Sequence, residues 1–296
     1  MSNITEIKNR MESVRDMQKI TNAMYLIASA KMRRAKTGLN ATKPYFNALK
    51  TEIKRVFRIE ERIDNRYFYP ITGEHEFEGA YAYLVITADK GLAGAYNQNV
   101  IKKVMELIGE HSPSRLFVVG EYGRQYFASH HIPFEKDFIF TAQNPTLNRA
   151  RKISNLLLDG YKTGEFKKIF VVYTDIGGGL NTEVNVMRLL PFHRAEFVTA
   201  KQEKAIEKPF EFLHSLDKLL DNIMPSYTTG FIYSAMVDSF CSEQSSRMNA
   251  MNSANENTKE ILSQLSQKYN HERQNRITQE ITEIAGASNN CGNRRI

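Results

Sequence analysis

Residues 4–39 read ITEIKNRMESVRDMQKITNAMYLIASAKMRRAKTGL, and this stretch decides the fold. One row of positions in it recurs at alternating intervals of three and four, which is the a/d spacing of a coiled coil. The row consists of Ile4, Ile7, Met11, Val14, Gln18, Thr21, Tyr25, Ala28, Met32, Ala35 and Leu39. Because Pro44 is the only proline and Gly38 the only glycine as far as Phe57, we predict one coiled-coil helix over residues 1–57.

A second apolar row runs beside the first and widens the apolar arc in the middle of this helix. It consists of Met17, Ile20, Met24 and Ile27. A helix with two adjacent rows can contact a partner helix and a further surface at the same time. The small or polar residues Thr21, Ala28 and Ala35 make the first row a weaker seam than a leucine zipper.

The C-terminal part repeats this pattern. Pro225 is a plausible first-turn proline, and Gly230 is the only helix breaker up to Ala285, so we predict a second coiled-coil helix over residues 226–287. Its seam consists of Met248, Met251, Asn255, Thr258, Leu262, Leu265 and Tyr269, and Ile277, Ile281 and Ile284 continue the stripe. Helices of roughly 80 and 90 Å are not stable alone, so each needs a partner along its length. The simplest partner for each is the other, in an antiparallel pair.

The middle of the chain alternates apolar strand candidates with helix candidates, which is typical of a mostly parallel sheet covered by helices. The strands are expected at 81–87, 116–119, 168–173 and 184–190, with the orientation of the last left open, and the helices at 97–109, after Gly120 and at 148–160. The predicted fold is therefore α+α/β, a long antiparallel coiled coil with a central Rossmann-like α/β domain at 80–194. We expect connectors at 58–79 and 195–225 and a polar tail at 288–296.

Charge is distributed unevenly along the chain. Residues 1–58 hold 13 Lys and Arg against 4 Asp and Glu, whereas residues 226–296 hold 7 of each, and the whole chain has a net charge of +7. The basic N-terminal part predicts an acidic partner, which could be nucleic acid, lipid headgroups or an acidic protein surface. The first eight residues lack the apolar stretch of a secretory signal, so we expect the protein to stay inside the cell. Cys241 and Cys291 are expected to be free thiols.

Candidate chemistry is sparse. Residues 89–97, DKGLAGAYN, follow a strand and open a helix, but they match neither GxxxxGK[ST] nor GxGxxG. We interpret them as a strand-to-helix turn that needs small residues, with nucleotide binding as the alternative. His130 and His131 lack metal-site spacing, and no GxSxG motif is present. We therefore predict no catalytic residue, no cofactor and no metal site.

Four stretches carry a family resemblance: 7–35, 87–97, 242–251 and 269–284. In this order they resemble the motifs of the gamma subunits of F-type ATP synthases, although the central motif has Ala88, Lys90 and Ala93 where the family often has Ser, Arg and Cys. The resemblance implies a non-catalytic rotor shaft, one copy per complex. Its coiled coil would stand inside three alpha and three beta subunits, and its α/β domain would lie against the epsilon subunit and the membrane c-ring.

The resemblance also implies a location and several contacts. The protein would be peripheral at the cytoplasmic face of the cell membrane, or on the matrix side of an organelle, and would bind no nucleic acid. Met24 matches the methionine near the acidic lever loop of beta, and the basic collar Lys31, Arg33 and Arg34 lies where it could meet such acidic groups.

Further contacts are implied at the C-terminal helix. Arg273 and Gln274 match the pair that hydrogen-bonds the catch loops of the cylinder, and Arg247, Thr278 and Glu280 match positions tied to energy coupling. The family commonly ends in Gly-Ala-Ala-Ala and an apolar residue, whereas this chain continues to residue 296 with two arginines and three asparagines. Because such side chains are costly in a dry sleeve, we expect the tail to protrude or fray. The plastid insert with its paired cysteines looks absent, so we expect no thiol control of that kind.

Two other classes of function stay open at this stage. A coiled-coil arm with a central hinge domain that binds nucleic acid would show salt-sensitive binding, but aromatic residues are scarce along its basic helix. An α/β enzyme that binds a nucleotide would use residues 91–97, but its motif is incomplete and acid/base groups are missing.

Overall fold

The computed structural model describes residues 4–59, 65–69, 78–176, 182–193, 197 and 216–292. Residues 177–181, most of both predicted connectors and the last four residues lie outside the described part. The two terminal helices are α1 (Ile4–Ile59) and α5 (Leu216–Gly292). By its internal contacts the chain forms two compact units, of residues 1–27 with 248–296, and of residues 28–247.

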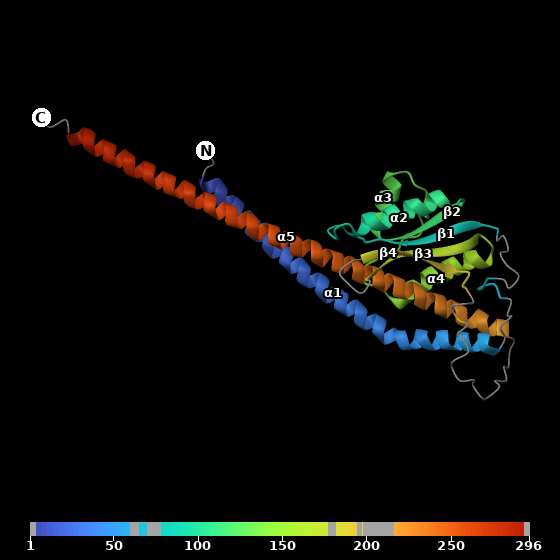
Figure 1. Cartoon of the computed structure of the whole chain (residues 1–296). Helices are drawn as coiled ribbons and strands as arrows, with labels where there is room; N and C mark the ends of the chain where they lie inside the picture. The colour runs from blue at the N-terminus through green and yellow to red at the C-terminus, as the bar shows by residue number, and fades with distance from the viewer. Residues whose placement is uncertain are drawn as a thin grey trace. The chain divides into compact units, whose positions relative to one another are not determined.

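In the first unit, the beginning of α1 and the distal part of α5 lie side by side and run antiparallel (Figure 1). The seam positions predicted there from Ile4 to Tyr25 and from Met248 to Tyr269 are buried or partly buried. Ile277, Ile281 and Ile284, which were predicted to continue the stripe, are exposed. The Thr21 hydroxyl donates a hydrogen bond to the side-chain oxygen of Asn255 across the pair. Such a polar layer costs stability compared with an apolar one but favours one register of the two helices.

The second unit contains a four-stranded sheet with strand order β2-β1-β3-β4. The strands are β1 (Ala80–Ile86), β2 (Ser114–Val119), β3 (Phe166–Ile176) and β4 (Thr182–Leu190). β1 pairs in parallel with β2 and β3, whereas β4 pairs antiparallel with β3. The prediction of long terminal helices around a mostly parallel sheet is confirmed, and the fourth strand is antiparallel.

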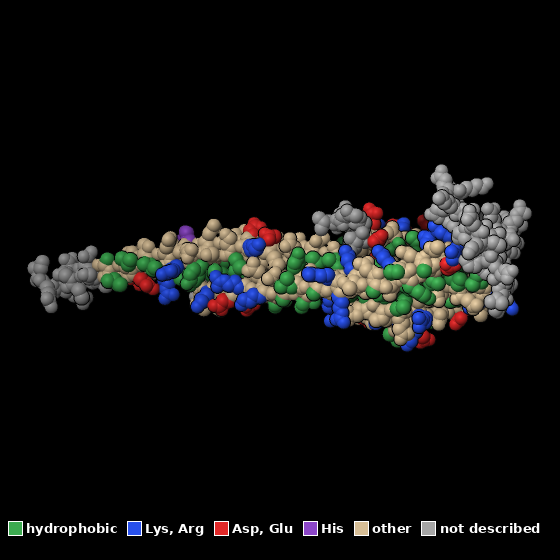
Figure 2. Space-filling view, turned by 90° about the horizontal axis from the view of Figure 1, so that it is seen from below, with side chains coloured by type: hydrophobic (Ala, Val, Ile, Leu, Met, Phe, Trp, Pro, Cys, Tyr) green, Lys and Arg blue, Asp and Glu red, His purple; other side chains and the backbone are tan. Residues whose placement is uncertain are grey.

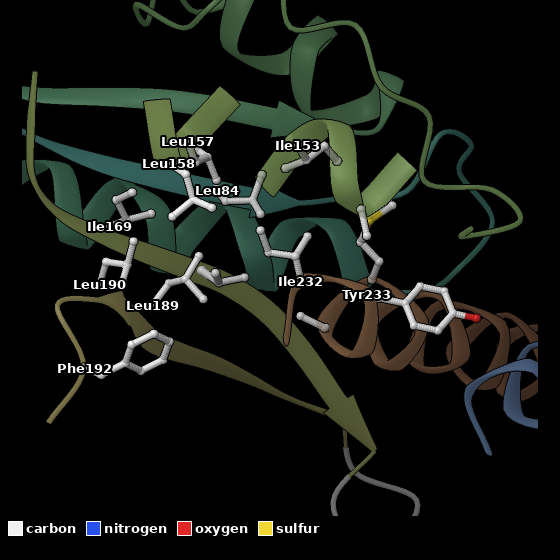
Figure 3. Close-up of a cluster of buried hydrophobic side chains, with 14 of the residues drawn as sticks. Leu84, Ile153, Leu157, Leu158, Ile169, Leu189, Leu190, Phe192, Ile232 and Tyr233 are labelled. Atoms are coloured by element: carbon white, nitrogen blue, oxygen red, sulfur yellow. The ribbon is translucent and has the colours of Figure 1, made fainter. Parts of the chain in front are cut away.

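Alternation of side chains along the strands divides the core into two clusters. Tyr83 and Val85 of β1 pack with Val100 of α2 (Tyr96–Glu110) and Phe127 of α3 (Glu121–Ser129). On the opposite face, Leu84 packs with α4 (Leu147–Lys162) and with α5. Figure 3 shows this second cluster, with residues such as Leu84, Ile153 of α4 and Ile232 of α5. Part of α5 is therefore a layer of the α/β domain.

Helix α5 differs from its prediction at both ends. It begins at Leu216, so residues 216–225, predicted as connector, are helical, and Pro225 lies inside the helix. A proline removes one backbone hydrogen bond there, but Leu220 and Met224 on the preceding turns are fully buried and hold the helix in place. The helix also continues to Gly292, so the predicted polar tail is helical from 288 to 292. No proline interrupts that stretch, and its backbone hydrogen bonds form within the helix.

Two helical glycines in the second unit differ in the space around them. A Cβ atom at Gly230 of α5 would overlap the ring of Phe46 on α1, whereas one at Gly38 of α1 would meet only the Tyr233 hydroxyl, at 3.4 Å. The absence of a side chain at Gly230 therefore allows the Phe46 ring to lie against the α5 backbone.

We predict opposite effects when each of these glycines is replaced by alanine. Gly230→Ala should lower the free energy of unfolding by about 1–3 kcal/mol through overpacking, despite the better helix propensity of alanine. Gly38→Ala, the matched control, should raise it by up to about 1 kcal/mol. Thermal denaturation of the full chain measures both. Equal effects of the two replacements would contradict the packing argument.

Candidate functional site

The loop after β1 is held together by the carboxylate of Asp89. One oxygen accepts hydrogen bonds from the backbone N–H groups of Glu121 (3.1 Å) and Ala142 (3.2 Å), and the other accepts from the N–H of Gln143 (2.9 Å) and from the Thr141 hydroxyl. Burial raises the pKa of Asp89, but the hydrogen bonds from Thr141 and then from the three N–H groups outweigh it and hold the pKa below its ordinary value. Asp89 thus fastens three separate loops to one another.

Other polar groups of this loop are also satisfied within the domain. The side-chain oxygen of Asn97 accepts from the N–H of Ala88 at 2.9 Å, and the Thr87 hydroxyl donates to the Val119 carbonyl at 2.9 Å. A phosphate placed here would meet the negative charge of Asp89. The geometry agrees with a strand-to-helix turn rather than with the nucleotide-binding alternative.

Arg247 of α5 contacts the same loop. Its guanidinium donates to the Gly91 carbonyl at 3.0 Å and forms a salt bridge with Glu243 at 2.6 Å. The Glu243 side chain is only 3% exposed. Burial raises the pKa of Glu243, and the positive charge of Arg247 opposes that rise. Arg247 was predicted as a contact residue from the sequence, whereas Glu243 was not. The signal for Glu243 was the i, i+4 spacing of a carboxylate and an arginine.

The basic collar of α1 lies in the second unit. Arg33 and Arg34 are exposed and Lys31 is half-buried. None of the three forms a salt bridge with another residue in the described part of the chain. On the face shown in Figure 2, Lys and Arg side chains lie beside apolar ones along the long helices. The arginines of the collar are thus available to an acidic surface.

The second apolar row of α1, in the first unit, is turned away from the seam. Met17, Ile20 and Ile27 are 56%, 61% and 55% exposed, and Met24 is half-buried. Exposed large apolar side chains in a row are typical of a surface that a partner covers. The prediction that α1 offers an apolar surface in addition to its seam is confirmed.

The remaining predicted contact residues lie on the distal part of α5. Arg273, Gln274, Thr278 and Glu280 are all exposed. Glu280 pairs with Arg276 at 3.0 Å, and the Thr278 hydroxyl donates to the Gln274 carbonyl at 3.0 Å. An exposed pair of this kind contributes little to stability, so Glu280 can exchange it for another partner at low cost. These four residues do not lie in one unit with Lys31, Arg33, Arg34 and Arg247.

Within the described residues, no cluster of His, Cys, Asp and Glu could hold a metal ion, and none of the helices is long and apolar enough to cross a bilayer. Cys241 is a buried free thiol, and burial raises its pKa to about 11.

We predict that Asp89→Asn lowers the free energy of unfolding by about 1 kcal/mol at pH 7, because the hydrogen bonds lose a charged acceptor. The folded-state pKa of Asp89 lies below the ordinary 3.8. Its contribution is therefore fully present above that value and is lost as the pH falls through the folded-state pKa. Urea unfolding of both proteins between pH 7 and 3 measures this. A difference that stays constant down to pH 3 would contradict the role of the charge.

Known proteins with similar sequences show to which family this chain belongs. A family model described as ATP synthase matches residues 3–290. An ATP synthase gamma chain from Caldanaerobacter subterraneus subsp. tengcongensis is 39% identical over 96% of this chain and 98% of its own length. A gamma chain from Acetobacterium woodii, described as sodium ion specific, is 32% identical over 97% and 98%.

Solved structures agree with the fold. A chain of the mitochondrial ATP synthase of Euglena gracilis aligns with a TM-score of 0.65 at 16% identity, covering 99% of this chain and 96% of that one. A chain from the central stalk and c-ring structure of the Tetrahymena thermophila enzyme gives 0.57 at 23% identity, covering 79% and 99%. The helix pair, the mixed sheet and the full-length similarity lead to one conclusion: this chain belongs to the ATP synthase gamma chain family.

Proposed function

We propose that this chain is the central rotor shaft of a rotary F-type ATP synthase and has no catalytic centre of its own. It couples ion flow through a membrane c-ring to the conformational cycle of the catalytic beta subunits. The observation that carries the proposal is the similarity to gamma chains over nearly the whole length of both partners. The antiparallel helix pair of the first unit, with apolar side chains exposed outside its seam, supports it.

The proposed partners are three alpha and three beta subunits around the helix pair, and the epsilon subunit and the c-ring at the α/β domain. One copy of the chain serves each complex. The protein is peripheral to the membrane, on the cytoplasmic face of a cell or on the matrix side of an organelle. We prefer the rotor shaft to the hypothesis of a coiled-coil arm that binds nucleic acid. In the rotor, the acidic partner of the basic collar is a protein surface.

The mechanism requires differential contact. A shaft shifts the conformation of each beta subunit only if it contacts the open and closed states with different free energies. The surface of the shaft is not uniform, because α1 carries an exposed apolar row in the first unit and a basic collar in the second. Rotation would therefore favour a different state at each beta subunit in turn.

Individual contacts are proposed as follows. Met24 lies near the acidic lever loop of beta, and Lys31, Arg33 and Arg34 meet its carboxylates. The exposure of both arginines supports this assignment.

On the distal part of α5, Arg273 and Gln274 bind the catch loops of the cylinder, and both are exposed. Thr278 and Glu280 contribute to energy coupling on the same segment, and Arg247 contributes from the α/β domain through its contacts with Glu243 and Gly91.

The first test is assembly. Expression with a tag on this chain and mass analysis of what co-purifies from a membrane extract should recover alpha and beta subunits. If no alpha or beta subunits are recovered and nucleic acid co-purifies with a steep dependence on salt, the result would instead support a coiled-coil arm that binds nucleic acid.

We predict that Met24→Lys impairs coupling more than assembly, because it adds a cation facing an acidic loop. ATP hydrolysis and ATP-driven ion pumping are measured on the same assembled complex, with Met24→Leu as the size-matched control. Pumping per ATP should fall in the lysine variant and stay near wild type in the leucine variant. Equal coupling in both variants would contradict the proposal that Met24 lies near the acidic loop of beta.

We predict that the double change Arg273→Ala and Gln274→Ala lowers rotary turnover several-fold while nucleotide binding at the individual beta sites of the complex is unaffected. The reason is that both residues contact the cylinder and neither contributes to a nucleotide site. Steady-state hydrolysis and equilibrium nucleotide binding measure the two quantities. Weakened nucleotide binding at the beta sites of the variant complex would contradict a pure contact role.

A further inference from the structure

One face of α5, within the second unit, carries hydrogen-bonding side chains where an apolar helix face would be expected. Ser239, Ser242, Glu243 and Arg247 follow the spacing i, i+3, i+4 and i+8, which places them on the same side of the helix. Ser239, Ser242 and Glu243 are buried. We refer to these four residues as the polar joint.

The two serines bind the backbone of a single strand residue. The N–H of Thr174 in β3 donates to the Ser239 hydroxyl at 3.1 Å, and the Ser242 hydroxyl donates to the Thr174 carbonyl at 3.1 Å. β1 ends at Ile86 and its pairing with β3 ends at Val172, so Thr174 lies past the end of that neighbour. The hydroxyls, each able to donate and accept, satisfy backbone groups that a longer β1 would otherwise serve.

Glu243 and Arg247 bind the loop that follows β1. Glu243 positions the Arg247 guanidinium, which in turn donates to the Gly91 carbonyl. The joint therefore fastens α5 to the ends of two adjacent strands: to β3 directly and to β1 through its loop. Asp89 in that loop extends the connection to the segments at Glu121 and at residues 141–143.

Apolar packing alone would hold α5 differently. Burial of apolar surface is roughly proportional to area and has no preferred direction, so by itself it fixes the rotation and position of a helix less sharply than directional contacts do. Hydrogen bonds have narrow ranges of distance and angle and resist both movements. The rest of the contact between α5 and the sheet consists largely of apolar residues, such as Ile232 and Met236.

We propose that the polar joint is the torque-transmitting connection between the α/β domain and α5, with Glu243 as the positioning residue for Arg247. This inference rests on the proposed rotor function. Ion-driven rotation would enter at the α/β domain, and the joint would prevent α5 from turning against the sheet. Among the four residues of the polar joint, the sequence resemblance suggested a coupling role for Arg247 and gave no role to Ser239, Ser242 or Glu243.

The test uses the complete complex in phospholipid vesicles, with the double variant Ser239→Ala/Ser242→Ala and the single variant Glu243→Gln. The matched control is Ser253→Ala/Ser263→Ala, at exposed positions of the same helix. ATP hydrolysis without an ion gradient and ATP-driven pumping against a gradient are measured on the same vesicles, together with the thermal stability of the complex.

The expected result is a several-fold loss of pumping against the gradient in the double variant and a smaller loss in Glu243→Gln, whose amide still accepts from Arg247. Hydrolysis without a gradient should stay near that of the control. A parallel decrease in hydrolysis, pumping and thermal stability would mean that the joint is only structural, and unchanged pumping in both variants would also overturn the proposal.

If the double variant does not assemble, the single variant Ser242→Ala is measured in its place. A selective loss of pumping would again support the proposal, and a parallel loss of hydrolysis, pumping and stability, or unchanged pumping, would again overturn it. Failure of the wild-type chain to assemble with alpha and beta subunits would instead reject the rotor function itself, so the two failures are distinguishable.

Discussion

The structure depends on a mutual requirement of its two terminal helices. Neither α1 nor α5 could persist alone as a helix of such length in water, because helix propensity contributes little over so many turns. Each is stabilised by burying a row of side chains in the other, and that row contains polar residues such as Thr21 and Asn255. An all-apolar seam would hold the helices more tightly but would permit several registers. The seam here gives up stability for a defined alignment, as a part that must present particular faces to its surroundings requires.

Helix α5 meets a second requirement in the other unit, where it is a layer of the α/β domain. Its buried face there includes apolar residues such as Ile232 and also serines, a glutamate and a glycine. A helix that only coils with a partner needs one stripe, whereas α5 needs one stripe for α1 and another for the sheet. This double demand explains why its apolar pattern is less regular before Met248 than after it, and why the small residue Gly230 lies beneath Phe46.

Much of this architecture was accessible from the sequence, because it rests on short-range periodicity. The strands near 81–87 and 168–173 stand out as apolar runs. The seams follow a spacing of three and four residues, which can be recognised without knowing how the two helices are aligned. The start of α5 was not accessible. Pro225 looks like a helix boundary locally, and only the burial of Leu220 and Met224 against distant segments overrides it.

Some features of the candidate site could likewise be predicted from the sequence, and others could not. The exposure of Arg33 and Arg34 follows from their positions off the seam, and the structure agrees. The partners of Asp89 could not be foreseen, since Thr141 and Gln143 lie more than fifty residues further along the chain and meet it only through the fold. Glu243 was missed because a carboxylate on a helix is usually solvated, and its burial depends on the sheet and loop packed over it.

The contact between Gly230 and Phe46 has a consequence for how this chain can diverge. The two positions lie far apart in sequence, yet the ring occupies the volume that any side chain at 230 would need. A lineage can enlarge position 230 only after position 46 has become smaller, and once both have changed, reverting either one alone is again unfavourable. Descendants of this chain should therefore carry the two residues as an inherited pair, with one large member and one small.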